Sequence, residues 1–386
     1  MSATQEAAAR LHEAAAPANA PADAPAAAAP AVDRRDRDGR DVGGPAQPLV
    51  IARDLVKHFP LKSALPFRRG GVVRAVDGVS FDVRKGETLG VVGESGCGKS
   101  TTARLLMQLT AHDSGELIFD AQGVGSPQLP MKAFRSQVQM VFQDSYSSLN
   151  PRLTIEQSIA FTPRVHGVDA REATERARQL LARVGLDPAR FAGRYPHELS
   201  GGQRQRVNIA RALALRPRLV ILDEAVSALD KSVEAQVLNL LLDLKAEFDL
   251  TYVFISHDLN VIRYLCDRVM VMYLGKVVEI GDTDAIFAHP AHPYTRALLA
   301  SMPSMDPDQR TQAAPLAGDP PNPIDPPPGC SFHPRCARAE PVCERRAPVL
   351  CDELAGHPVS CLMAMPDGGH SLPLRRLTPG LHAATP

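Results

Sequence analysis

The sequence predicts an α/β fold in which helices cover a mostly parallel sheet. Two short runs, 219–222 and 252–255, are wholly apolar, which is typical of strands buried on both faces. A segment with helical spacing of apolar residues, 233–248, lies between them. A third apolar run, 89–92, leads through a glycine-rich turn into a helix-like segment at 100–109. Strands that alternate with helices indicate a parallel sheet with helices on its faces.

Two strand pairs joined by loops are also predicted. The runs 269–272 and 276–280 flank a Leu-Gly turn, which predicts a hairpin. Strand-like patterns at 49–52 and 76–83 flank a polar, Gly-containing segment, 61–73, which predicts a hairpin-tip loop. A further short strand is expected at 116–119.

The bulk composition limits the classes of protein to consider. The chain has 386 residues, enough for two domains, and a hydrophobic content of 44% that is ordinary for a globular core. Lys+Arg and Asp+Glu both number 43, so no basic excess indicates nucleic-acid binding. The sequence predicts neither a membrane span nor a signal peptide. We therefore expect a cytoplasmic protein whose seven cysteines are free thiols or metal ligands.

The glycine-rich turn is a phosphate-binding motif. The run 93–100 fits G-x-x-x-x-G-K-[ST] at every fixed position and stands between a strand and a helix, as the motif requires. Its glycines let backbone N–H groups cradle phosphate oxygens, and the helix start adds its positive end. Lys99 supplies a charge to the β- and γ-phosphates, and Ser100 supplies a hydroxyl to Mg²⁺. The predicted nucleotide-binding residues here are Gly93, Glu94, Ser95, Gly96, Cys97, Gly98, Lys99, Ser100 and Thr101.

Cys97 lies inside this motif and has two interpretations. It is either a small residue that fits the turn, or a partly exposed thiol that Lys99 and the helix N-terminus make acidic and reactive. The second interpretation predicts that alkylation inactivates the protein and that ATP protects it.

A second glycine-containing helix start occurs at 199–203. Ser200 is a natural N-cap, and Gln203 stands three residues later, as in a capping box. Gly201 and Gly202 leave backbone N–H groups bare, so this helix start is also suited to bind an anion. A Ser-Gly turn without function is the alternative.

Two carboxylates follow the apolar run 219–222. Asp223 is expected to help hold Mg²⁺ at the tip of the strand, where α/β proteins bind ligands. Glu224 is placed to polarise an attacking water. A solvated strand end is the alternative for this pair.

Together these motifs resemble the nucleotide-binding subunit of an ABC transporter, over about residues 48–362. The strings 147–151, 195–198, 289–290, 292–295 and 329–336 further resemble the ATPase subunits of bacterial oligopeptide and dipeptide importers. The resemblance implies a P-loop NTPase of the ABC type, with an antiparallel β subdomain, a helical subdomain at about 145–216 and a small Cys-rich C-terminal extension.

The resemblance also assigns roles to single residues. Gln143 would contact Mg²⁺ together with Ser100, and would sense the membrane subunits. His257 would hold the γ-phosphate, and Glu224 would be the general base. Phe59 is the expected adenine-stacking ring, with His58 as the alternative. Further nucleotide contacts are implied for Ser200, Gly201, Gly202, Gln203, Asp223 and Asp230.

The implied activity is ATP hydrolysis that powers import of di- or oligopeptides across the bacterial inner membrane. The implied partners are a second homologous ATPase, two transmembrane permease subunits and, indirectly, an extracytoplasmic peptide-binding protein. In this arrangement each signature helix, 199–203, faces the ATP of the other ATPase. The alternatives are a soluble ABC ATPase, or an importer ATPase for nickel or glutathione.

The expected domain organisation has four parts. Residues 1–46 are Ala/Pro-rich and predicted to be disordered, because they cannot bury enough apolar surface. Residues 47–300 form the ATPase domain, 301–362 a Pro/Cys-rich extension and 363–386 a flexible tail.

Five cysteines fall within 32 residues of the extension. Their spacing is wider than that of zinc knuckles, so spacing alone is a weak metal signal. The resemblance favours an iron–sulfur cluster or zinc on Cys330, Cys336, Cys343 and Cys361, with Cys351 left out. Free structural cysteines are the alternative, and His333 and His357 are spare candidate ligands.

Overall fold

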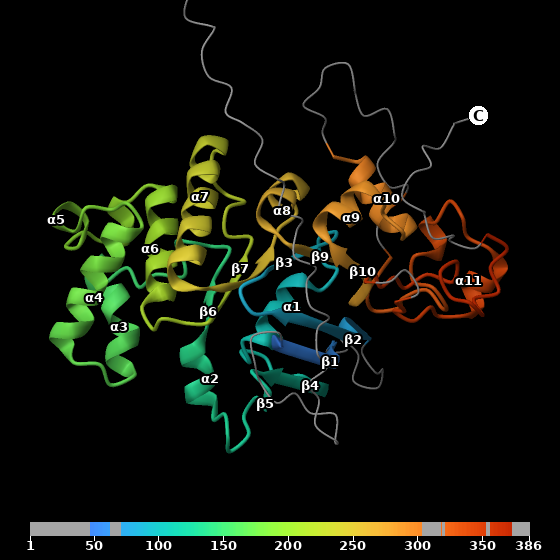
Figure 1. Cartoon of the computed structure of the whole chain (residues 1–386), viewed down its shortest axis with the longest axis horizontal. Helices are drawn as coiled ribbons and strands as arrows, with labels where there is room; N and C mark the ends of the chain where they lie inside the picture. Colours follow the sequence, from blue (N-terminus) through green and yellow to red (C-terminus); the bar gives the residue numbers. More distant parts are fainter. Residues whose placement is uncertain (1–46, 62–70, 303–317, 319–320, 353–355, 373–386) are drawn as a thin grey trace, which may run out of the picture. The chain divides into compact units, whose positions relative to one another are not determined.

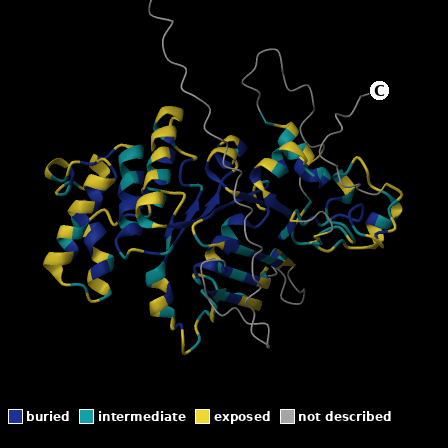
Figure 2. Ribbon diagram, viewed as in Figure 1, coloured by how far each residue is buried: buried dark blue, intermediate teal, exposed yellow. Residues whose placement is uncertain are grey.

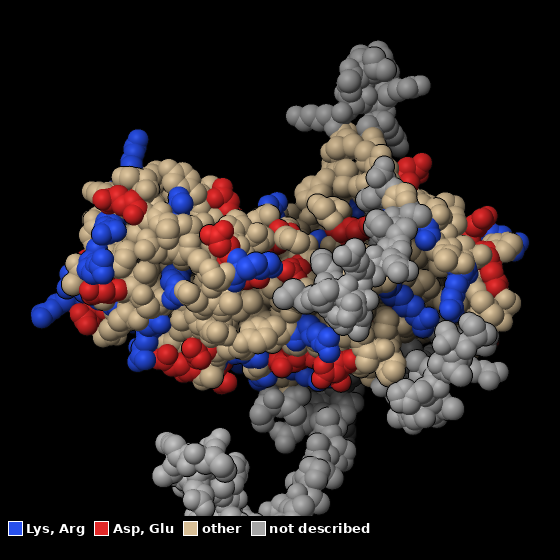
Figure 3. Space-filling view, turned by 90° about the horizontal axis from the view of Figure 1, so that it is seen from above, with Lys and Arg blue, Asp and Glu red and all other residues tan. Residues whose placement is uncertain are grey.

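Two sheets organise the residues that this computed structural model describes, which are 47–61, 71–302, 318, 321–352 and 356–372 (Figure 1). The segment 1–46, predicted to be disordered, lies outside them. Acidic and basic side chains are mixed over the face seen in Figure 3. Among the described residues, no helix has the length and apolar character that a membrane crossing needs.

The larger sheet has six strands and is mostly parallel. Its order is β10 (Lys276–Asp282), β9 (Arg268–Tyr273), β3 (Thr88–Val92), β8 (Thr251–Ile255), β7 (Leu219–Asp223) and β6 (Val138–Val141). Only β10 runs antiparallel, forming with β9 the hairpin that the sequence predicts. Every residue of β3, β7, β8 and β9 is buried, which explains their wholly apolar runs.

The two faces of this sheet pack into different hydrophobic clusters. On β8, Tyr252 and Phe254 join the cluster that contains α6, α7 and α8, whereas Val253 and Ile255 join the cluster around α1. This alternation follows from the two-residue period of a strand. The helices concerned are α1 (Lys99–Leu106), α6 (Gly201–Leu213), α7 (Lys231–Phe248) and α8 (Leu259–Leu265).

The smaller sheet is antiparallel and packs on the α1 side. Its order is β2 (Val72–Arg84), β1 (Pro48–Pro60), β4 (Ser114–Phe119) and β5 (Gln122–Gly123). The pairing of β1 with β2 extends from Pro48↔Arg84 to Pro60↔Val72. Most of the predicted connecting loop, residues 62–70, falls outside the described residues.

Four helices fill the region in which the sequence predicts a helical subdomain. They are α3 (Ile155–Val165), α4 (Ala170–Arg183), α5 (Pro188–Phe191) and α6. On α4 the buried residues are Ala173, Ala177, Leu180 and Leu181, one face of a helix. Figure 2 shows this inner face dark and the outer face exposed. Thr154 and Ser200 begin α3 and α6 with complete capping boxes.

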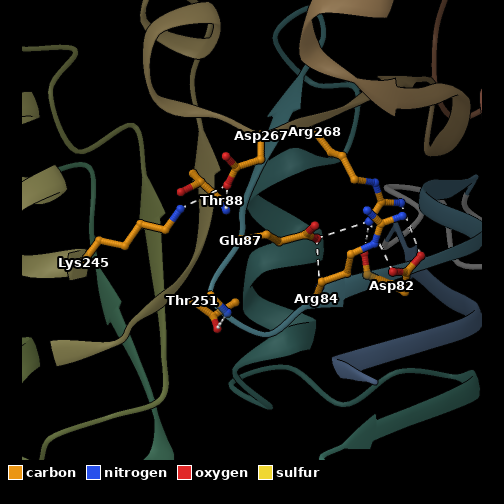
Figure 4. Close-up of polar contacts among 9 residues, drawn as sticks. Asp82, Arg84, Glu87, Thr88, Lys245, Thr251, Asp267 and Arg268 are labelled. Carbon is orange, nitrogen blue, oxygen red and sulfur yellow. Dashed lines mark hydrogen bonds and ion pairs between the residues drawn. The ribbon is translucent and has the colours of Figure 1, made fainter. Parts of the chain in front are cut away.

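A polar network joins the two sheets at the end of β3 that is opposite the phosphate-binding turn (Figure 4). The guanidinium of Arg268 lies 3.2 Å from carboxylates of both Asp82 and Glu87. Burial raises the pKa of Glu87, against the lowering effects of a backbone N–H and of Arg268. Asp267 accepts from the Thr88 N–H and from Lys245. These contacts fix where β3 begins, and therefore where the turn after it lies.

Shorter elements complete the described chain. They are α2 (Met131–Gln137), η1 (Pro196–Glu198), α9 (Thr283–Ala288), α10 (Pro293–Ala300), η2 (His333–Arg335) and α11 (Pro341–Arg345). The flexible tail predicted from residue 363 needs a correction. Met363 and Ala364 are buried in a small cluster with Val359 and Cys361, because their apolar side chains have a surface to pack on. The described chain continues to residue 372.

Candidate active site

The phosphate-binding turn connects β3 to α1, and its glycines are required by close backbone contacts. A Cβ atom at Gly93, where φ is +148°, would lie 2.2 Å from the carbonyl oxygen of Met272. A Cβ atom at Gly98, where φ is +110°, would lie 2.3 Å from the carbonyl oxygen of Ala75. Both sheets therefore press on the turn, and only glycine fits at these two positions.

Lys99 begins α1 and directs its side chain back into the turn. Only 6% of the residue is exposed. Its ammonium donates hydrogen bonds to the carbonyl oxygens of Gly93 at 2.7 Å and Glu94 at 3.0 Å. The turn thus holds a buried positive charge at the start of a helix, which is an arrangement suited to a polyphosphate.

Ser100 and Asp223 meet at the carboxyl end of β7. The Ser100 hydroxyl donates to Asp223 Oδ1 at 3.0 Å. Burial raises the pKa of Asp223, and the hydrogen bond from Ser100 opposes that change. A hydroxyl and a carboxylate side by side are oxygen ligands of the kind that Mg²⁺ prefers, so the residues present fit that ion.

Two further side chains, those of Gln143 and His257, converge on the carboxylate of Glu224. Gln143 follows β6, Glu224 follows β7 and His257 follows β8, so all three lie at the carboxyl edge of neighbouring parallel strands. Gln143 Nε2 donates to Glu224 Oε2 at 2.8 Å, and His257 Nδ1 lies 3.6 Å from the same oxygen. The backbone of Glu224 is left-handed, with φ of +47°, and its N–H donates to the carbonyl oxygen of Ile255. The fold therefore brings together the residues that the sequence predicts to be catalytic.

The signature segment 199–203 opens α6 as the sequence predicts. Gln203 N–H donates to Ser200 Oγ at 3.4 Å, and Gln203 Oε1 accepts from Ser200 N–H at 3.0 Å. A Cβ atom at Gly202 would lie 2.5 Å from Val233 Cγ1, so glycine lets α6 begin close to α7. Asp230 stands at the N-cap position of α7.

Comparison with known proteins agrees with this geometry. Residues 76–227 match the family model described as ABC transporter, and residues 278–343 match the model described as Oligopeptide/dipeptide transporter, C-terminal region. The chain is 50% identical over 318 residues to the oligopeptide transport ATP-binding protein AppF of Bacillus subtilis, covering 81% of this chain and 96% of that protein. This chain belongs to the ABC transporter family. It is an ATP-binding, ATP-hydrolysing member of it.

Other relatives support the same assignment. The dipeptide transport ATP-binding protein DppF of Escherichia coli is 48% identical over 318 residues, covering 82% of this chain and 94% of that protein. Among solved structures, cbiO1 from Clostridium perfringens aligns with a TM-score of 0.54 at 26% identity, covering 63% of this chain and 91% of that one. The cassette MJ0796, a dimer bound to ADP and phosphate, aligns with a TM-score of 0.53 at 28% identity, covering 61% of this chain and 98% of that one.

In this ABC ATPase the two candidates for stacking on adenine differ in their contacts. Phe59 lies near the end of β1 with 40% of the residue exposed, and the Lys57 ammonium lies 5.5 Å from its ring centroid. His58 Nε2 is engaged by Asp77 Oδ1 at 2.9 Å. Of the two rings, that of Phe59 is the more exposed.

The environment of Cys97 contradicts the interpretation of this residue as an exposed, reactive thiol. The residue is only 3% exposed, and burial raises the pKa of its thiol although Lys99 acts to lower it. A partly exposed, acidic thiol is therefore wrong for this position. The side chain packs inside the turn, where the backbone is too close to its neighbours to leave it open to solvent.

Two residues at the site are absent from the sequence-based list. Arg335, from the C-terminal extension, donates from Nη1 to Glu94 Oε2 at 2.7 Å and from Nη2 to Glu94 Oε1 at 2.9 Å. The Tyr294 hydroxyl accepts from the Glu94 N–H at 2.8 Å. Both residues stand in strings that resemble peptide importers, but nothing local in the sequence indicates their pairing with the turn.

Four of the five cysteines in the extension lie around one cavity, but not close enough together to form a metal site. Cys330, Cys336, Cys343 and Cys361 line one cavity, and Cys351 is not among its lining residues. Burial raises the pKa of Cys330 to about 11 and that of Cys361 to about 12. Within the described part of the chain, no three His, Cys, Asp or Glu side chains already form a group that could hold a metal ion. His357 instead binds the buried carboxylate of Glu279 at 2.6 Å.

Proposed function

We propose that this ABC ATPase powers the import of di- or oligopeptides through transmembrane partner subunits. The observation that carries the hydrolytic part is the convergence of Gln143 and His257 on Glu224, next to the Asp223 that Ser100 of the turn contacts. The cargo class rests on relatives that are named as oligopeptide and dipeptide transport proteins. A nickel or glutathione importer, and a soluble ATPase, are the alternatives that the experiment below separates.

Hydrolysis at this site would be phosphoryl transfer to water. Glu224 accepts a proton from the attacking water, and the water oxygen forms a bond to the γ-phosphorus. The bond between the γ-phosphorus and the β–γ bridging oxygen breaks, and ADP leaves with that oxygen. Lys99 and His257 stabilise the negative charge on the γ-phosphate. Mg²⁺, held by Ser100 and Gln143 with help from Asp223, would supply further charge neutralisation.

The partner ATPase completes each site. Ser200, Gly201, Gly202 and Gln203 present the bare N-terminus of α6 to the ATP of a second, homologous subunit. Asp230 ends the loop that follows Glu224 and stands at the start of α7. The family resemblance assigns it to this interface. The dimeric form of the similar cassette MJ0796 is a precedent for such pairing in that protein.

A groove beside Gln143 is the proposed docking site of the permease subunits. Its lining includes Leu109, Phe142 and Phe161. Leu109 and Phe161 are 51% and 57% exposed, which is high for apolar side chains on a free surface. Because Phe142 is adjacent to Gln143, a partner seated here would move the residue that touches Glu224. Docking would place the protein peripherally, at the cytoplasmic face of the inner membrane.

The four cysteines of the cavity are proposed to bind an iron–sulfur cluster or zinc. Thiolates are the ligands that both centres use, and the four side chains share one lining. The thiols would have to close together around the metal. Iron, sulfide and zinc analysis of anaerobically purified protein tests the proposal, and the absence of both metals would refute it.

Co-purification and transport test the function as a whole. The tagged chain is expected to co-purify with two multi-span membrane proteins from its own cells. In vesicles that contain this complex and its binding protein, labelled di- or oligopeptide should accumulate only with ATP. Accumulation of nickel or glutathione instead, or purification without membrane proteins, would contradict peptide import.

A further inference from the structure

The phosphate-binding turn carries a negative charge of its own. Glu94 is the second residue of the turn, and its side chain is 23% exposed. An unpaired carboxylate here would stand close to the site of an anionic triphosphate. Two like charges a few ångströms apart in a partly desolvated site repel strongly. The turn therefore needs a counter-charge for Glu94 that leaves Lys99 available for the nucleotide.

Arg335 supplies that counter-charge from 241 positions further along the chain. Both of its terminal nitrogens contact the Glu94 carboxylate, which is the two-pronged geometry that makes arginine–carboxylate pairs strong. The Arg335 side chain is only 5% exposed. The hydrogen bond with Glu94 raises the pKa of Arg335, so the guanidinium stays charged.

The surroundings of Arg335 hold it in this position. Its guanidinium lies 6.0 Å from the ring centroid of Tyr273. Phe332, three residues earlier, packs edge-on against Tyr273 at 5.3 Å and against Tyr294 at 5.5 Å between ring centroids. Tyr294 in turn accepts the hydrogen bond from the Glu94 N–H. The extension thus contacts the turn directly through the Arg335–Glu94 ion pair, and indirectly through Phe332, which packs on the tyrosine that accepts the Glu94 N–H.

We propose that Arg335 is a positioning residue for ATP binding: by neutralising and fixing Glu94, the C-terminal extension sets the affinity of the phosphate-binding turn for nucleotide. The inference rests on ATP binding at this turn. Arg335 acts through Glu94 and touches no reacting atom. Removing it leaves Glu94 unpaired beside the triphosphate, whereas removing both charges takes away the repulsion as well as the pair.

The test measures equilibrium binding of labelled Mg-ATP to the full-length chain. Arg335→Gln is expected to weaken binding about tenfold, and Arg335→Gln combined with Glu94→Gln to restore it to within about threefold of the wild type. Arg345→Gln, an exposed arginine of the same extension, is the matched control and should bind normally. In the assembled complex, Arg335→Gln should raise the KM for ATP and leave kcat within about twofold, because Glu224 and His257 are untouched.

Wild-type affinity in Arg335→Gln would overturn the proposal, and so would equal weakness of the single and double variants. If Arg335→Gln does not fold by circular dichroism, Arg335→Lys replaces it, because lysine keeps the charge but not the two-pronged contact. A loss of about threefold is then expected, and unchanged affinity would overturn the proposal. The wild-type chain binding ATP in the same assay separates failure of this inference from failure of the nucleotide site itself.

Discussion

Gln143 donates a 2.8 Å hydrogen bond to Glu224, and this contact joins the loops that follow two neighbouring strands, β6 and β7. Glu224 is the proposed general base, and Gln143 is adjacent to Phe142 in the groove proposed for the permease. The hydrogen bond is therefore a direct physical link between the proposed docking surface and the proposed general base. Movement of the Gln143 loop would change the position of Glu224.

Glu224→Gln is expected to keep ATP binding and to lower turnover in the assembled complex at least about 100-fold, because an amide cannot accept the proton of the attacking water. Steady-state phosphate release measures turnover, and labelled ATP measures binding. Lys99→Ala should instead lose most of the binding. Glu247→Gln, an exposed residue of α7, is the control and should behave as the wild type. Near-normal turnover in Glu224→Gln would refute the assignment.

Gln143→Ala should make the rate of ATP hydrolysis insensitive to the loaded peptide-binding protein. Binding of ATP is expected to stay within about threefold of the wild type, because Lys99 and the turn are unchanged. The stimulation of ATPase activity by the loaded peptide-binding protein should largely disappear, since the contact with Glu224 is lost. Gln179→Ala on α4 is the matched control, because the Gln179 amide donates to the exposed Glu175 carboxylate at 3.2 Å on the surface of the helix. Full stimulation in Gln143→Ala would argue against the link.

Cys97 should react slowly with alkylating reagents. Its thiol is buried with a raised pKa, so little thiolate is exposed at neutral pH. In the native protein, iodoacetamide is expected to modify Cys97 at least about tenfold more slowly than the less buried Cys351, with no effect of ATP. Peptide mass spectrometry over a time course gives both rates. Fast labelling that ATP prevents would show that the turn opens in solution.

Asp120→Asn should lower stability near neutral pH but not in acid. The hydrogen bond from Arg218 chiefly holds the pKa of Asp120 below its usual value, and Lys85 adds to the effect. The carboxylate thus contributes stability above about pH 4, and that contribution disappears as the pH falls through the lowered folded-state pKa. Because a third of the side chain is exposed, the loss at pH 7 should be only about 0.5–1 kcal/mol.

Urea unfolding at several pH values checks this prediction. Asparagine tolerates the left-handed backbone of Asp120, whose φ is +48°, so the substitution removes charge without adding strain. The two proteins should become equally stable towards pH 3. A constant difference across the whole range would mean that the ion pair is not its cause.

Features that depend on neighbouring residues could be predicted from the sequence alone. The phosphate-binding turn, the wholly buried strands β7 and β8, the hairpin of β9 and β10 and the capping box at Ser200 all follow from local spacing, residue size and burial pattern. The family resemblance then indicated Gln143, Glu224 and His257. Their spacing in the sequence does not show that the three side chains lie close together in space. By contrast, β6 has no counterpart among the predicted strands, because its run V-Q-M-V is only four residues long and alternates between apolar and polar over only the first three.

What the sequence by itself determined is the kind of chemistry, because a glycine-rich turn before Lys99 suits a polyphosphate whatever surrounds it. Only the tertiary structure decided which groups meet. It buries Cys97 rather than exposing it, packs Met363 into a cluster rather than leaving a loose tail, and pairs Glu94 with Arg335. Burial and ion pairing are set by the atoms that folding brings close, and here those atoms come from distant parts of the chain.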